Sequence, residues 1–91
     1  KDANIVYTAT WISMHQKKEK YEILTRFGPF QLNKKLMSYA KKNAIFMHCL
    51  PAYKFREDTD QIIDSNQSVV FDQAENRMWA QLALIIKLFQ D

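Results

Sequence analysis

The feature that most constrains the fold is a continuous apolar run, Ala44–Met47, which ends at His48, Cys49, Leu50 and Pro51. A strand with one solvated face alternates apolar and polar residues, whereas a strand of a parallel sheet covered on both faces is apolar throughout. We therefore expect a buried strand of a parallel sheet here, with a histidine and a cysteine placed just beyond its end.

The segments on either side alternate between strand-like and helix-like patterns. Gly28 and Pro29 are expected to end one helix, and Asn33 is expected to cap the next. Asp72 and Glu75 resemble a capping box at the start of the last helix. In chain order the predicted elements are a strand at Ile5–Ala9, a helix at His15–Phe27, a helix at Lys34–Lys42, a strand at Ala44–Met47, a short helix capped by Thr59 that includes Ile62 and Ile63, a strand at Ser68–Phe71, and a final helix with Met78, Leu82, Ile85, Ile86 and Phe89 on one side.

This order of elements predicts an α/β fold. We expect part of a Rossmann-like three-layer domain, in which a short parallel sheet is flanked by helices. Three short strands are few for such a sheet, and the sequence shows no internal repeat, low-complexity tract or linker. Residues 1–91 are therefore expected to form one piece of a domain.

Composition excludes several classes of function. Hydrophobic residues make up 47% and charged residues 25% of the chain, a globular balance, and the scattered net charge of +3 does not favour nucleic-acid binding. The single glycine excludes a glycine-rich phosphate loop, and the single cysteine excludes an internal disulfide. The longest apolar stretch is too short to span a bilayer. We expect a cytoplasmic protein with no nucleic-acid or membrane partner.

Three polar stretches follow the three predicted strands: Thr10–Gln16, His48–Pro51 and Asp72–Arg77. In an open parallel sheet, ligands bind at the carboxyl ends of the strands, so these stretches are expected to converge on one site.

Cys49 and His48 each allow a functional and a structural interpretation. A thiol at the end of a strand can act as a nucleophile or lie close to a reacting amine. Alternatively, Cys49 is a small buried residue and His48 a hydrogen-bonded core histidine. A metal site is rejected because the two residues are adjacent and only His15 is available to join them.

Arg77 lies in the first turn of the predicted last helix, where the helix dipole disfavours a cation unless an anion or a carbonyl group faces it. Its planar guanidinium suits phosphate or a polarised carbonyl oxygen. The alternative is a salt bridge to Asp72 or Glu75.

Four stretches together resemble the ornithine carbamoyltransferase family, in the later part of its C-terminal, ornithine-binding domain. The order and spacing of the stretches fit that family, and the resemblance extends over nearly all 91 residues. The stretches are Ser13-Met14, "FMHCLPA" at Phe46–Ala52, "TDQIID" at Thr59–Asp64 and "SVVFDQAENR" at Ser68–Arg77.

The resemblance implies transfer of a carbamoyl group from carbamoyl phosphate to ornithine, giving citrulline and phosphate in arginine metabolism, without a cofactor. It implies that Cys49 lies beside the reacting centre, that the Leu50 carbonyl accepts from the carbamoyl amide, and that Arg77 holds the carbamoyl oxygen. Ser13 and Met14 match the loop that closes on ornithine. The resemblance also implies a cis Leu50-Pro51 peptide bond and, for the full-length enzyme, a homotrimer.

The sequence departs from the family at several positions. Ala9 stands where the family has the aspartate that binds the α-amino group of ornithine. His15 replaces a glycine, and Tyr53–Arg56 replaces histidine-arginine-glycine-glutamate.

The family's N-terminal domain, with its serine-threonine-arginine-threonine phosphate loop, is not among these 91 residues. We therefore expect the isolated chain to be inactive as a transferase. The alternatives are a non-catalytic remnant that acts as a binding or assembly module and, less favoured, a carbamoyltransferase for another amine.

Overall fold

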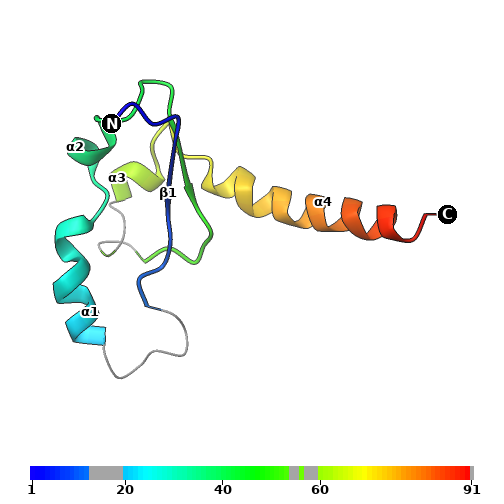
Figure 1. Ribbon diagram of the computed structural model, residues 1–91, viewed down its shortest axis with the longest axis horizontal. Coiled ribbons are helices and arrows are strands. Elements are labelled where there is room, and N and C mark those ends of the chain that lie inside the picture. The colour runs from blue at the N-terminus through cyan, green and yellow to red at the C-terminus, as the bar shows by residue number, and fades with distance from the viewer. Residues whose placement is uncertain (13–19, 54–55, 57–59, 91) are drawn as a thin grey trace.

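The computed structural model describes residues 1–12, 20–53, 56 and 60–90, and within them the fold is the predicted α/β one. Two strands lie between helices, and a long C-terminal helix extends from the body of the molecule (Figure 1). The elements are β1 (Ile5–Thr8), α1 (Lys20–Phe27), the 3-10 helix η1 (Gly28–Phe30), α2 (Lys34–Met37), β2 (Ile45–His48), α3 (Asp60–Ile63) and α4 (Val70–Leu88).

The two strands are parallel, and their pairing runs from Ile5 opposite Ile45 to Thr8 opposite His48. The prediction of a third strand at Ser68–Phe71 is wrong. This segment forms only one isolated parallel bridge, between Ser68 and Phe46. The Phe46 N–H donates to the Gln67 carbonyl at 2.7 Å, and the Val69 N–H donates to the Phe46 carbonyl at 3.0 Å. The chain then turns at once into α4.

α4 begins at Val70, two residues before Asp72. The predicted place of Arg77 in the first turn is therefore wrong: Arg77 lies about two turns into the helix, beyond the turn where the helix dipole acts. Val69 is the N-cap of α4 and makes no side-chain capping bond, so Asp72 is not the cap. The carboxylate of Asp72 instead lies in the first turn, where the helix dipole favours a negative charge.

α2 is shorter than the predicted helix Lys34–Lys42. Asn33 caps it as predicted, because its side-chain oxygen accepts from the Leu36 N–H at 2.9 Å. The α-helix ends at Met37. Beyond it the backbone hydrogen bonds join residues three apart, as in a 3-10 helix, and the Ala40 N–H donates to the Met37 carbonyl. α1 ends before Gly28-Pro29 as predicted, while residues 15–19 of that predicted helix and the predicted cap Thr59 lie outside the described residues.

The core lies on one side of β2. Phe46 and His48 are fully buried, whereas the alternate residues Ile45 and Met47 are only half-buried, so the prediction that β2 is buried on both faces is wrong. Tyr7 of β1 is more than half exposed. The buried apolar residues are Leu32, Met37, Ala44, Phe46, Ile62, Ile63 and Val70.

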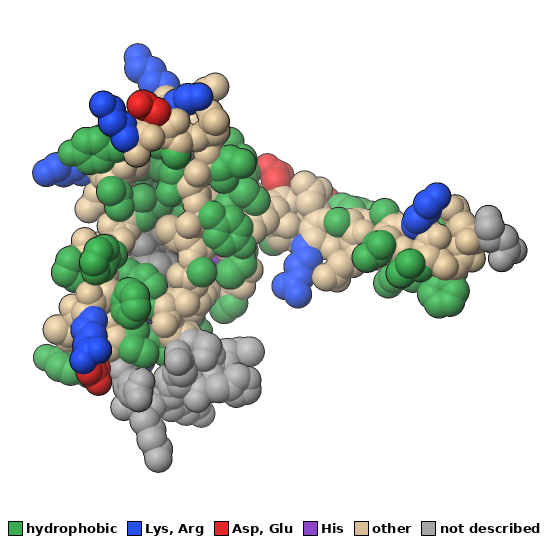
Figure 2. Space-filling model, viewed as in Figure 1, with side chains coloured by type: hydrophobic (Ala, Val, Ile, Leu, Met, Phe, Trp, Pro, Cys, Tyr) green, Lys and Arg blue, Asp and Glu red, His purple; other side chains and the backbone are tan. Residues whose placement is uncertain are grey.

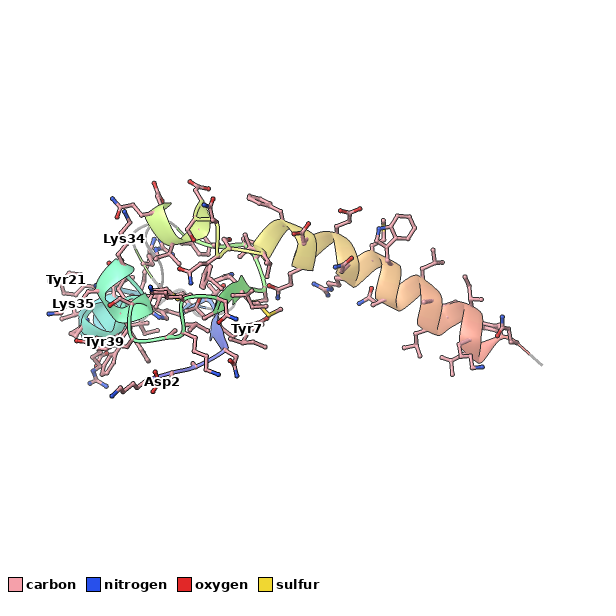
Figure 3. The ribbon with its side chains drawn as sticks, turned by 90° about the horizontal axis from the view of Figure 1, so that it is seen from above. Asp2, Tyr7, Tyr21, Lys34, Lys35 and Tyr39 are labelled. Atoms are coloured by element: carbon pink, nitrogen blue, oxygen red, sulfur yellow. The ribbon has the colours of Figure 1, made fainter. Side chains whose placement is uncertain are left out.

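α4 contributes little to this core. Val70 is its only buried residue among those described, and its apolar side chains beyond Arg77 are exposed. Seen from above, the helix extends away from the body with side chains around it (Figure 3), and hydrophobic side chains line its C-terminal half (Figure 2). No helix in the described part of the chain is long and apolar enough to cross a membrane.

Removing the α2 cap should lower stability by a small, defined amount. Asn33→Ala leaves the Leu36 N–H without its acceptor, and we expect the free energy of unfolding to fall by about 1 kcal/mol in urea denaturation. Asn33→Ser keeps a capping oxygen and should remain close to the parent chain. Equal losses in both variants would contradict a capping role.

Truncating Phe46 should have a much larger effect. Phe46→Ala removes a fully buried ring from the centre of the core, and we expect a loss of about 3–5 kcal/mol, enough to unfold a small domain of low stability. Phe71, which is 69% exposed, is the matched control, and Phe71→Ala should change stability little. Circular dichroism during denaturation measures both, and a similar cost at the two positions would refute this assignment of the core.

Candidate active site

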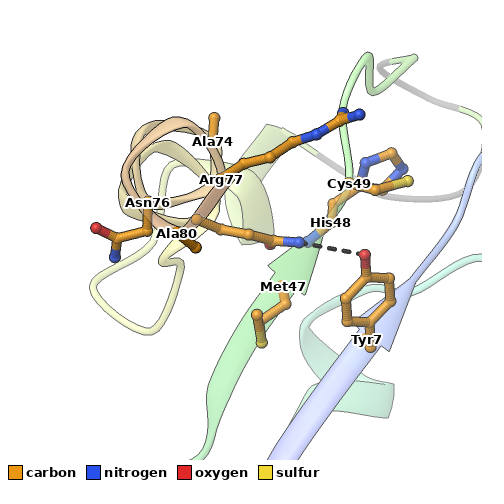
Figure 4. A pocket seen from close by; sticks show the side chains of 9 residues that line it. Tyr7, Met47, His48, Cys49, Ala74, Asn76, Arg77 and Ala80 are labelled. Carbon is orange, nitrogen blue, oxygen red and sulfur yellow. Dashed lines mark hydrogen bonds between the residues drawn. The ribbon is translucent and has the colours of Figure 1, made fainter. Parts of the chain in front are cut away.

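A pocket of about 530 Å³ opens where the carboxyl ends of β1 and β2 meet the first turns of α4 (Figure 4). It brings together residues from the second and third polar stretches of the sequence. Its lining consists of Tyr7, Met47, His48, Cys49, Gln73, Ala74, Asn76, Arg77 and Ala80.

Cys49 is exposed, so the interpretation of it as a small buried residue is wrong. It is the residue directly after β2, and the pairing of Thr8 with His48 brings Ala9 to the same edge of the sheet. The thiol is therefore accessible from the pocket, at the position where ligands bind in open parallel sheets.

His48 is the hydrogen-bonded core histidine of the structural interpretation. Its side chain is fully buried, and its Nδ1 accepts from the backbone N–H of Leu50 at 2.9 Å. A nitrogen that accepts a hydrogen bond carries no proton, so this contact fits the neutral imidazole. The histidine thus fixes the turn that carries Cys49.

The turn after Cys49 has an unusual backbone. The Leu50-Pro51 peptide bond is cis, as the resemblance implies, and Leu50 has φ of 47°, in the left-handed region that few non-glycine residues adopt. The Thr10 hydroxyl donates to the Pro51 carbonyl at 3.1 Å. This bond joins the first polar stretch to the second.

Arg77 is exposed and lines the same pocket as Cys49, although 28 positions separate them in the sequence. Figure 4 shows its side chain reaching from α4 towards the side where Cys49 and His48 lie. Within the described residues it forms no ion pair with Asp72 or Glu75, and the Glu75 carboxylate accepts from the Trp79 indole N–H at 3.2 Å. The salt-bridge alternative is wrong, and the guanidinium faces the pocket.

Gln73 is the lining residue that sequence reasoning missed. Its side-chain oxygen accepts from the backbone N–H of His48 at 3.0 Å, and its amide nitrogen donates to the Tyr7 hydroxyl at 3.2 Å (the dashed line in Figure 4). A glutamine in the first turn of a helix has no sequence signature of its own, so only the tertiary contacts reveal this bridge.

Several predicted positions lie outside the described residues: Ser13, Met14, His15, Lys54 and Phe55. Arg56, at the end of the loop that departs from the family pattern, is described, and its guanidinium lies 4.5 Å from the centre of the Tyr53 ring. No group of three or more histidine, cysteine, aspartate or glutamate side chains in the described ranges is arranged to hold a metal ion.

Known proteins match the chain closely. It is 53% identical to the ornithine carbamoyltransferase of Methanococcus aeolicus over 90 residues, which cover 98% of the chain and 30% of that relative. A solved ornithine carbamoyltransferase from Pyrococcus furiosus superposes with a TM-score of 0.85 at 53% identity, over 93% of this chain and 27% of that one. The anabolic enzyme of Campylobacter jejuni superposes with a TM-score of 0.90 at 40% identity, over 97% and 29% of the two chains.

The chain thus spans about 30% of the length of the curated relatives it matches. The family model described as "Aspartate/ornithine carbamoyltransferase, Asp/Orn binding domain" matches residues 1–88, nearly the whole chain. The chain belongs to the aspartate/ornithine carbamoyltransferase family, and its match is to the family's Asp/Orn binding domain.

Proposed function

We propose that these residues form the ornithine-side half of an ornithine carbamoyltransferase active site. The observation that carries the proposal is the meeting of Cys49 and Arg77 at one pocket, in a chain whose relatives bear that enzyme's name. The substrates would be carbamoyl phosphate and ornithine, and the products citrulline and phosphate.

The reaction is an acyl-type transfer. The side-chain amine of ornithine attacks the carbamoyl carbon, the bond from that carbon to the phosphate oxygen breaks, and the amine loses a proton as phosphate departs. Negative charge develops on the carbamoyl oxygen during the attack. A fixed cation aimed at that oxygen lowers the barrier most, and we assign this role to Arg77.

The turn after β2 supplies the remaining groups. We assign the Leu50 carbonyl to accept from the carbamoyl amide, and Cys49 to lie beside the attacking amine. His48 Nδ1 holds the Leu50 N–H, and Thr10 holds the Pro51 carbonyl, so both sides of the turn are tied down. Ser13 and Met14 are assigned to close on the amino-acid end of ornithine.

Activity would require a carbamoyl-phosphate-binding domain that these 91 residues do not supply. No serine-threonine-arginine-threonine loop is present in the sequence, and among the described residues the pocket is lined by β1, β2, Cys49 after β2, and α4. We propose that the working enzyme is a longer chain, assembled as a trimer in the cytoplasm, and that the isolated 91 residues do not catalyse transfer.

One observation favours a second candidate, a non-catalytic remnant. Ala9 is exposed at the sheet edge, where the resemblance implies an aspartate for the α-amino group of ornithine. A charge-assisted hydrogen bond contributes about 1.5–3 kcal/mol, so its loss weakens binding about 10- to 150-fold. A carbamoyltransferase for an amine without an α-amino acid group would be affected less.

The role of Arg77 is tested by citrulline formation from carbamoyl phosphate and ornithine. We expect none from the chain alone and activity when it is mixed with a separately expressed segment that supplies the first domain and the rest of the second domain. Arg77→Ala should lower kcat of the mixture by about 10²–10³, since it removes a group that stabilises the developing oxyanion. Cys49→Ala should also lower it.

Lys87→Ala is the matched control, because it removes a cation from the same helix far from the pocket and should leave kcat unchanged. Citrulline from the chain alone, or a full rate in Arg77→Ala, would overturn the assignment.

The Ala9 substitution separates the two candidates. In the same mixture, Ala9→Asp should lower the KM for ornithine about tenfold or more if the site is otherwise intact. Ala3→Asp adds the same charge before the other end of β1 and should not change KM. An Ala9→Asp chain that gains nothing would favour the remnant.

A further inference from the structure

Gln73 stands out because one side chain joins three elements around the pocket. Its carboxamide accepts from the last N–H of β2, on His48, and donates to the hydroxyl of Tyr7 in β1. Gln73 itself belongs to the first turn of α4. The ends of both strands are therefore tied to the helix that carries Arg77.

α4 has few other means of fixing its orientation. Its N-cap Val69 bonds to the Phe46 carbonyl, and Val70 is its only buried residue among those described, so both attachments lie at the very start of the helix and leave it free to tilt. Gln73, three residues after Val70, supplies a further attachment away from that start. Because residues four apart lie on the same face of a helix, fixing Gln73 also fixes the direction in which Arg77 points.

The same carboxamide acts on the other wall of the pocket. By holding the His48 N–H it fixes the backbone immediately before Cys49, while His48 Nδ1 holds the Leu50 N–H immediately after Cys49. One glutamine thus sets both Arg77 and the Cys49 turn.

We infer that Gln73 is a positioning residue for carbamoyl transfer, which aligns Arg77 with the Cys49 turn through its bonds to His48 and Tyr7. This inference rests on the proposed function for its catalytic consequence. The alignment itself has a readout that does not need the reaction.

The first arm of the test measures catalysis in the same mixture with the separately expressed remainder of the enzyme. A misplacement of about 1 Å at a reacting centre can cost 10²-fold, so Gln73→Met should lower kcat about 100-fold while the KM for ornithine changes little. Gln73→Glu can accept from both the His48 N–H and the Tyr7 hydroxyl and should recover most of kcat. Asn33→Ala, which affects a helix cap remote from the pocket, should retain the parent kcat.

The second arm uses the 91-residue chain alone and its single thiol. Cys49 is treated with an anionic disulfide, 5,5′-dithiobis(2-nitrobenzoate), and with neutral 2,2′-dithiodipyridine. A guanidinium close to the thiol should speed the anionic reagent selectively, and at low salt Arg77→Ala should lower the ratio of the two rates about threefold. Gln73→Met should lower this ratio of rates by at least half of the decrease seen in Arg77→Ala. The ratio for Tyr7→Phe should lie between those of Gln73→Met and the parent chain.

The outcomes separate the inference from the proposed function. The expected rate ratios together with an inactive mixture would refute the proposed function and leave the alignment standing. An unchanged ratio in both Gln73→Met and Tyr7→Phe, or no effect of Arg77→Ala, would refute the alignment. Equal kcat losses in Gln73→Met and Asn33→Ala would show that Gln73 contributes stability alone.

Discussion

The structure depends on the two backbone hydrogen bonds that Phe46 makes with the segment 67–69. They pin that segment beside β2 while the Phe46 ring fills the core with Val70. The second of these bonds joins the Val69 N–H to the Phe46 carbonyl, and α4 starts at the next residue. The first turn of α4 therefore lies at the end of the sheet. Every contact of Gln73 and Arg77 with the pocket follows from that starting point.

Local signals predicted much of this arrangement. Gly28-Pro29 ended α1 and Asn33 capped α2, because helix termini are determined by the backbone groups of a few neighbouring residues. The place of Cys49 just beyond the end of β2 was predicted from the apolar run that ends at a turn-forming proline, whereas its exposure was left open by the sequence. The rule for parallel sheets predicted that the second and third polar stretches meet at one pocket, but the third stretch reaches it as part of α4 and not as the end of a strand.

The features that the sequence did not predict depend on tertiary contacts. Val69 and Val70 have β-branched side chains that favour a strand, yet burial of Val70 in the core holds it in a helix, and packing overrides propensity. The capping box was predicted at Asp72 for the same reason, because the residues before it were expected to form a strand. Gln73 had no local signal, since its importance lies in where β1 and β2 end relative to α4. The roles of Ser13 and Met14 stay predictions, as both lie outside the described residues.

The single buried residue of α4 has a consequence for how the molecule opens. Amides of β2 exchange with solvent only when the core opens, whereas the last turns of α4 are protected by the helix's own hydrogen bonds alone and fray from Leu88 backwards. The opening free energy should therefore fall along the helix from its buried start at Val70 to its exposed end at Leu88. Arg77 lies between these two ends, so its backbone depends on the contacts of Val70 and Gln73 and gains no protection from the exposed turns that follow.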